Sequence, residues 1–132
     1  MKKYASLIVV IIALLGCENQ TNKIYLNEMD LSKMEIGWGS VNINKSVDGN
    51  PLLINGKQYE NGVGTHAVSK MMIDLYGKGK HFYSQVGVDD ESGERASIEF
   101  FVLGDKKVLW QSGIMKKGDE AKEVSLDISG IQ

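Results

Sequence analysis

Two short polar clusters contain the residue types that could take part in chemistry. The first is Gly62-Val63-Gly64-Thr65-His66-Ala67, which places a histidine ring among small residues. The second is Val86-Gly87-Val88-Asp89-Asp90-Glu91, in which three carboxylates follow an apolar, alternating run. A ring donor beside small residues, together with acids at a strand end, suits a shallow site for a polar ligand. The same residue types also occur in ordinary loop-rich β domains.

Catalytic motifs are missing from the sequence. No glycine-rich phosphate loop follows a predicted strand, and there is no nucleophile elbow. His66 and His81 lack metal-ligand spacing to each other or to the single cysteine, Cys17. Glycosidases need two carboxylates at a set separation across the substrate, an arrangement that adjacent acids on one loop rarely adopt. The chain by itself is therefore predicted not to be an enzyme and to use no organic cofactor.

Binding of a hydroxyl-rich ligand suits these residues better. Carboxylates and amides exchange several hydrogen bonds with hydroxyls, and an aromatic ring packs against the C–H face of a sugar. The candidate ligand residues are Trp38, His66, Asp89, Asp90, Glu91 and Arg95. Alternatives stay open: from the residues alone we favour a core position for Trp38, while His66 equally suits a loop histidine bonded to a carbonyl. The acid triplet equally suits a solvated or calcium-bracing turn.

The N-terminus has the features of a bacterial lipoprotein leader. Met1-Lys2-Lys3 is a positive head, and residues 5–15 form an apolar run too short to span a bilayer. The run ends in Leu14-Leu15-Gly16-Cys17, where a small residue precedes a free thiol. We expect a signal peptide over residues 1–16, a lipid on Cys17 and a tether over residues 17–23. The protein would then be anchored to a bacterial membrane and face the periplasm or the cell surface; a buried helix with a chance cysteine is the alternative.

The remainder of the chain has the pattern of an all-β sandwich. A length of 132 residues allows at most one domain, and a net charge of −2 with interspersed lysines and acids excludes a general nucleic-acid binder. Turn signals such as Asn55-Gly56 and Gly104-Asp105-Lys106-Lys107 separate β-prone runs. These runs predict strands near residues 24–26, 52–54, 57–59, 70–76, 82–88, 96–103, 108–111 and 123–128. Residues 96–103 are apolar on both faces, which predicts a strand inside the sandwich.

From about Ile24 to Gln132 the chain resembles the NPCBM family of carbohydrate-binding modules. The motifs that carry the resemblance are Gly37-Trp38-Gly39, Asp48-Gly49-Asn50-Pro51-Leu52, Asn55-Gly56, the two polar clusters, and Leu109-Trp110-Gln111-Ser112-Gly113. The resemblance implies a galactose-binding-like jelly roll attached to glycoside hydrolases such as α-galactosidases. It also implies a galactose-containing glycan as ligand and, commonly, a structural calcium ion whose ligands the sequence does not assign. By position it places family site residues on Trp38, His66 and the acid triplet, with Arg95 as a weaker candidate.

The chain departs from the family at its C-terminal end. Family members continue into a segment rich in His, Asp and Trp, whereas this sequence stops at Gln132. We therefore expect a truncated module over residues 24–132 that lacks its last strands, has an exposed sheet edge and is marginally stable. The predicted function is that of a non-catalytic binding module of a lipid-anchored glycoside hydrolase, with a catalytic domain downstream. The alternative is a structural or protein-contact sandwich without a working sugar site.

Overall fold

The structure is a computed structural model that describes residues 22–132, so the predicted leader, Cys17 and most of the tether lie outside it. The described chain is built from strands, with a single 3-10 turn, η1 (Leu26–Glu28), near its start. The strands are β1 (Asn42–Ile43), β2 (Leu52–Ile54), β3 (Lys57–Tyr59), β4 (Val63–Gly64), β5 (His81–Val86), β6 (Ser97–Gly104), β7 (Lys107–Lys116) and β8 (Lys122–Asp127). The all-β prediction is confirmed. Among residues 22–132, no helix has the length and apolarity needed to cross a membrane.

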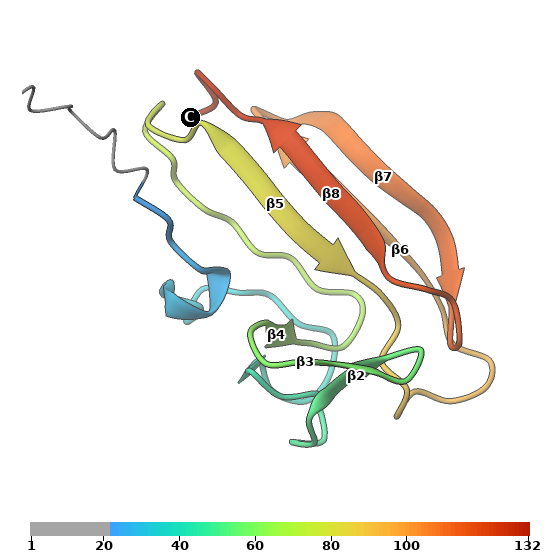
Figure 1. Cartoon of the computed structure of the whole chain (residues 1–132). Coiled ribbons are helices and arrows are strands. Elements are labelled where there is room, and N and C mark those ends of the chain that lie inside the picture. The colour runs from blue at the N-terminus through green and yellow to red at the C-terminus, as the bar shows by residue number, and fades with distance from the viewer. Residues whose placement is uncertain (1–21) are drawn as a thin grey trace, which may run out of the picture.

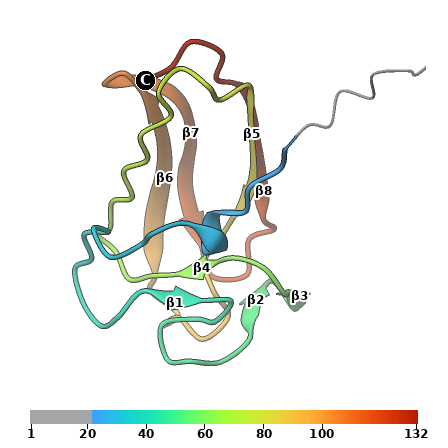
Figure 2. The ribbon, with the colours of Figure 1, turned by 90° about the vertical axis from the view of Figure 1, so that its left-hand side faces the viewer.

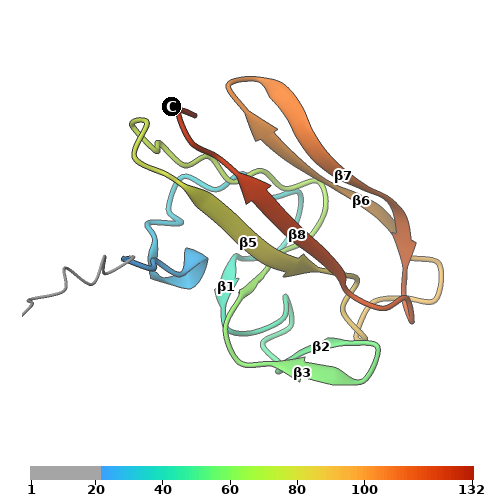
Figure 3. The same ribbon diagram turned by 45° about the horizontal axis from the view of Figure 1, so that its top comes forward.

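The strands form four antiparallel pairs: β1 with β4, β2 with β3, β5 with β8, and β6 with β7. β5 and β8 pair along their whole length, from His81 opposite Asp127 to Val86 opposite Lys122. Figures 1 and 3 show this pair and the β6–β7 hairpin running together along the molecule. The small β1–β4 and β2–β3 pairs lie at one end, and the chain finishes at the opposite end (Figure 2).

Both predicted hairpin turns are confirmed. Asn55 and Gly56 have φ values of 47° and 76°, and Asp105 and Lys106 have φ values of 48° and 68°. Two consecutive positive φ values are those of a type I′ turn, whose twist matches the twist of the paired strands. Local turn chemistry therefore sets the register of β2 with β3, and that of β6 with β7 next to the turn; farther along, the β6–β7 register shifts between Val102 and Leu103 and again between Glu99 and Phe101.

The core is small and lies where the β5–β8 pair meets the β6–β7 hairpin. Met115 of β7 and Val124 of β8 are fully buried, and Val88 and Ile128 are nearly so. No other hydrophobic side chain in the described part of the chain falls in the buried class. Little apolar area is thus withdrawn from water, and the stability that burial provides is correspondingly limited.

One face of β6 is open, which corrects the prediction that both faces are covered. Ile98, Phe100 and Val102 are half-buried, whereas Phe101 and Leu103 are 49% and 57% exposed. Within residues 22–132, β6 pairs only with β7, so its second edge has no partner. An apolar face and a free edge on one strand make a surface that favours association.

Two predicted strands are wrong. Residues 24 and 25 lead into η1, which begins at Leu26, and the Tyr25 N–H donates to the Glu28 carboxylate at 3.1 Å and caps that turn. Residues 71–75 alternate between half-buried and exposed, as predicted, but they form no ladder with the rest of the described chain. A single bridge, between Glu35 and Lys70, precedes them. The alternation shows that one face of this segment is partly buried. A strand also requires a hydrogen-bonded neighbour, which these residues lack in the described chain.

Candidate functional site

The Asp89 and Asp90 carboxylates hold the β2–β3 hairpin against the end of β5. Asp89 accepts the Leu53 N–H at 3.0 Å with one oxygen and the Glu91 N–H at 3.0 Å with the other. Asp90 accepts the N–H groups of Asn55 at 2.9 Å and Gly56 at 2.7 Å. The Asp90 N–H in turn donates to the Leu53 carbonyl at 2.9 Å. The two acids therefore satisfy backbone donors at the tight turn and on the strand that leads into it.

The Glu91 carboxylate holds a second segment, the loop of residues 46–50. It accepts the Ser46 hydroxyl at 2.6 Å, the Asn50 amide at 3.0 Å and the Asp48 N–H at 3.1 Å. Partial desolvation raises the pKa of Glu91, but the hydrogen bonds from Ser46, Asn50 and the loop backbone outweigh it. The net pKa therefore lies below the ordinary value of 4.5. Glu91 is ionised when it ties this loop to the end of β5.

The three acids together form what we call the acidic clasp, Asp89-Asp90-Glu91. All six carboxylate oxygens receive an N–H or O–H donor. Among residues 22–132, no three His, Cys, Asp or Glu side chains gather in a way that would hold a metal ion. The three acids do not converge on one point as the main ligands of a calcium ion would, so the structural calcium ion stays a prediction without assigned ligands. Direct contact of the clasp with a sugar remains a prediction.

Trp38 and His66, by contrast, come together on the surface. Their ring centroids lie 5.5 Å apart with an interplanar angle of 68°, an edge-to-face contact. Trp38 is 60% exposed, so the core position favoured from the residues alone is wrong. His66 Nδ1 lies 2.6 Å from the Ala67 carbonyl oxygen. Because a carbonyl only accepts, Nδ1 carries the proton, and Nε2 of the neutral ring is left as an acceptor.

The β1–β4 pairing explains why these two rings meet. Asn42 lies opposite Gly64 and Ile43 opposite Val63, so the chain just before β1 runs beside the chain just after β4. Gly37 permits the close approach, since a Cβ there would lie 2.7 Å from the Ala67 carbonyl oxygen. The Gly-Trp-Gly and Gly-x-His-Ala motifs therefore lie side by side on the surface and contribute one ring each to the same pair.

Arg95 stands apart from both groups. It is exposed in the loop between β5 and β6. Its guanidinium takes part in none of the hydrogen bonds or ion pairs within the part of the chain that the structure describes; the ion pair found there joins Lys117 to Glu94. The structure therefore pairs Trp38 with His66 and gathers the three acids around two loops, without a direct contact between these groups.

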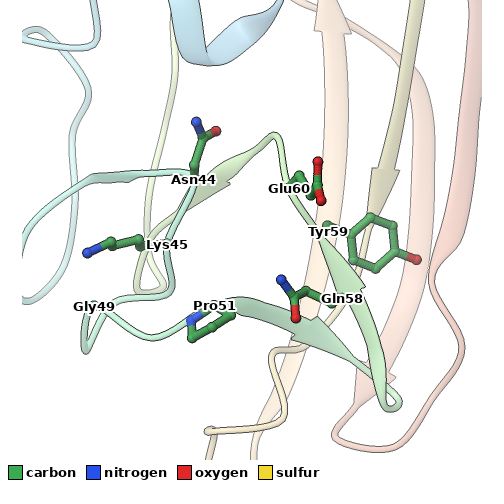
Figure 4. A pocket seen from close by; sticks show the side chains of 7 residues that line it. All are labelled: Asn44, Lys45, Gly49, Pro51, Gln58, Tyr59 and Glu60. Carbon is green, nitrogen blue, oxygen red and sulfur yellow. The ribbon is translucent and has the colours of Figure 1, made fainter.

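A depression at the other end of the β1–β4 pair was missed from the sequence. Its volume is about 420 Å³, and it lies between the loop after β1 and the β2–β3 hairpin (Figure 4). The residues that line it are Asn44, Lys45, Gly49, Pro51, Gln58, Tyr59 and Glu60. The turns at Asp48-Gly49-Asn50-Pro51 and Asn55-Gly56 were readable signals, but their proximity depends on the acidic clasp. Figure 4 shows Gln58 and Glu60 on one side and Asn44 and Pro51 on the other.

An exposed ring pair and a polar depression, both on loops at one end of a β-sandwich, define the class of a ligand-binding module. The chain belongs to the NPCBM/NEW2 domain family, whose family model matches residues 22–132. This family is one of non-catalytic carbohydrate-binding modules that occur within glycoside hydrolases, which confirms both the resemblance and the prediction that the chain is not itself an enzyme.

Solved structures agree with this assignment. The CBM51 module from Clostridium perfringens GH95, in complex with methyl-galactose, is 34% identical with a TM-score of 0.74, over 82% of this chain and 80% of that one. A structure of Clostridium perfringens ZmpB that holds the M60 catalytic domain with the CBM51-1 and CBM51-2 domains is 31% identical. Its TM-score is 0.74, over 83% of this chain and 12% of that one. The predicted galactose-binding-like sandwich is confirmed.

A curated relative places the module in a larger protein. Alpha-1,3-galactosidase B from Akkermansia muciniphila is 33% identical over 93 residues, which cover 69% of this chain and 12% of the relative. The chain thus spans about an eighth of that relative's length.

Proposed function

We propose that this chain is the galactose-binding module of a lipid-anchored glycoside hydrolase. The observation that carries the proposal is the exposed Trp38–His66 pair on a fold whose solved relative was obtained with methyl-galactose. The name of the galactosidase relative supports galactose-containing glycans as the ligand class and a catalytic domain in the same protein.

The ring pair has the chemistry that sugar recognition requires. The exposed part of Trp38 offers an apolar surface to the C–H groups on one face of a galactose ring. His66 Nε2 accepts a hydroxyl hydrogen, because Nδ1 is held by the Ala67 carbonyl and fixes the tautomer. Edge contact between the rings keeps them in place before the ligand arrives, which limits the entropy lost on binding.

Calorimetric titration of methyl galactoside and methyl glucoside into the full chain tests this proposal. We expect galactoside binding that is lost in Trp38→Ala and retained in Tyr83→Ala, which removes another exposed aromatic side chain, on β5. Equal binding of both sugars would refute the galactose preference. Unchanged binding by Trp38→Ala would refute the site.

The anchor is a separate part of the proposal. It is supported by the positive head, the apolar run and Gly16-Cys17 in the sequence. We propose lipidation of Cys17 and attachment to a bacterial membrane, with the module facing the periplasm or the cell surface. Metabolic labelling with a fatty-acid analogue should mark the wild type and leave Cys17→Ser unlabelled and released from membranes. Labelling of the Cys17→Ser chain would overturn the assignment.

A structural or protein-contact module is the second candidate. It is favoured by the acidic clasp, whose oxygens all accept hydrogen bonds from within the chain. A chain that binds no galactoside with or without added calcium would support this candidate. Melting with calcium and with a chelator also tests the structural calcium ion: a midpoint that rises with calcium requires a site, and that site would involve ligands other than the clasp.

A further inference from the structure

We infer that the depression between the residue 44–51 loop and the β2–β3 hairpin is a second sugar contact, which takes a neutral, hydroxyl-rich unit of the same glycan. This inference rests on the proposed carbohydrate-binding function and extends it to residues that the family resemblance did not place in the binding site. The depression is open to solvent and has a volume of about 420 Å³, so it would hold one sugar unit against the surface and would not enclose it.

Both walls of the depression are held rigid from behind. Glu91 fixes the loop wall through Ser46, Asp48 and Asn50. Asp90 fixes the hairpin wall through the N–H groups of Asn55 and Gly56. The same short segment therefore sets the distance between two walls that lie far apart in sequence. A preformed site of this kind binds a ligand without ordering loops first.

The side chains at the rim have polar groups to spare. Lys45 and Glu60 carry opposite charges, and neither belongs to an ion pair with another described residue. The Asn44 side-chain oxygen Oδ1 accepts the Gly62 N–H at 3.1 Å and the Asn27 amide at 2.9 Å, and its NH₂ group donates to no other described residue. The exposed Gln58 amide adds both a donor and an acceptor.

This mixture selects a ligand class. One cation and one anion cancel, so the depression offers no net charge to a sialic acid or a sulfated sugar. Amide donors and acceptors beside a carboxylate match hydroxyl groups, each of which donates one hydrogen bond and accepts two. Pro51 supplies a small apolar surface at the bottom of the loop wall (Figure 4). A neutral pyranose fits these groups better than a charged one.

The depression is distinct from the ring pair. Trp38 precedes β1 and His66 follows β4, whereas Asn44 follows β1 and Glu60 precedes β4. In an antiparallel pair these positions fall at opposite ends of the ladder. A glycan that reaches both contacts would bind more tightly through the two weak sites together than through either site alone.

Amide-resolved NMR titration of the full chain, solubilised in a mild detergent and bearing Cys17→Ser, tests the inference with methyl galactoside, methyl glucoside and galacturonate as probes. We expect neutral sugars to shift the signals of Asn44, Gln58 and Glu60 separately from the Trp38 indole. Glu60→Gln and Gln58→Ala should each weaken the shifts in the depression about tenfold, roughly 1.4 kcal/mol. The matched control is Glu120→Gln, an exposed glutamate outside the depression, which should change nothing.

Each outcome is decisive. Shifts at the Trp38 indole alone would leave the proposed function standing and overturn the second site. Shifts in the depression that survive Trp38→Ala support the second site even if the ring pair fails. Stronger binding of galacturonate than of neutral sugars would overturn the ligand class, and a lack of shifts at either place would overturn both proposals.

Discussion

Replacement of Glu91 by alanine should destabilise the domain by about 2 kcal/mol, because it opens one side of the acidic clasp. Three donors lose their acceptor: the Ser46 hydroxyl, the Asn50 amide and the Asp48 N–H. Asn50 and Asp48 are exposed and can turn to water, so their bonds contribute little to the difference. Ser46 is only 1% exposed, and its hydroxyl would be left buried without an acceptor. That penalty is about 1–3 kcal/mol and dominates the sum.

The pH dependence of stability follows from the lowered pKa of Glu91. A folded-state pKa below 4.5 means that the unfolded chain binds the proton more tightly. The stabilisation is therefore fully present above the unfolded-state value and is lost as the pH falls through the folded-state value. Wild type should lose more stability than Glu91→Gln between pH 7 and about pH 3, since the glutamine variant has no carboxylate to protonate. The other carboxylates are the same in the wild type and in Glu91→Gln, so their contributions to the pH dependence of stability cancel in the comparison.

Thermal and urea unfolding followed by circular dichroism give the required numbers. For a domain of this size, 2 kcal/mol corresponds to a fall in melting midpoint of about 8 °C. A double-mutant cycle with Ser46→Ala isolates the hydrogen bond, and we expect a coupling of about 1–2 kcal/mol. A Glu91→Ala chain that melts at the wild-type temperature but binds galactoside more weakly would refute the clasp and make Glu91 a ligand contact.

Three further outcomes are expected. Asp90→Ala should cost about 0.5–1.5 kcal/mol in urea unfolding, because the exposed Asn55 and Gly56 N–H groups lose their carboxylate acceptor but can bond to water; unchanged stability would contradict this role. Gly64→Ala should cost at least about 2 kcal/mol by pushing its Cβ into the Lys45 carbonyl and the Ser46 backbone, while Gly93→Ala, which has open space around it, is the matched control. With four fully or nearly buried hydrophobic side chains, the domain should melt below about 60 °C, and a cooperative transition above that temperature would refute the expectation of marginal stability.

The hairpin turns and the strands beside them could be predicted, because their structure depends on neighbouring residues in the sequence. The Asn55-Gly56 and Asp105-Lys106 turns and the strands beside them follow from residues next to one another in sequence. Residues 71–75 show the opposite case: the alternation was correctly predicted, but a strand also needs a neighbour that the pattern does not specify. The open face of β6 was unpredictable for the same reason, since two-sided apolarity says nothing about what covers each side.

The candidate site shows the same division. The motifs around Trp38 and His66 were found from residue types, but their edge-to-face contact depends on the pairing of β1 with β4. The acids were also found, yet their partners could not be, because Ser46 and Asn50 lie 45 and 41 residues away from Glu91. The lining of the depression was missed because Asn44, Gln58 and Glu60 have no distinctive motif of their own.

A binding module must hold its loops in place and must also adapt to different sugars. The acidic clasp serves the first of these requirements and the rim side chains serve the second. A carboxylate that accepts several backbone donors is costly to move, so it is poorly suited to adapt to different sugars. Side chains at the rim, such as Gln58 and Glu60, can be replaced without disturbing the hydrogen bonds that hold the loops. Ligand preference can therefore change at the ring pair and in the depression while the clasp keeps both loops in place. On this reasoning, swapping rim residues between relatives should transfer sugar preference with little change in stability, whereas swapping the clasp should lower stability and weaken binding in the depression, whose two walls it holds.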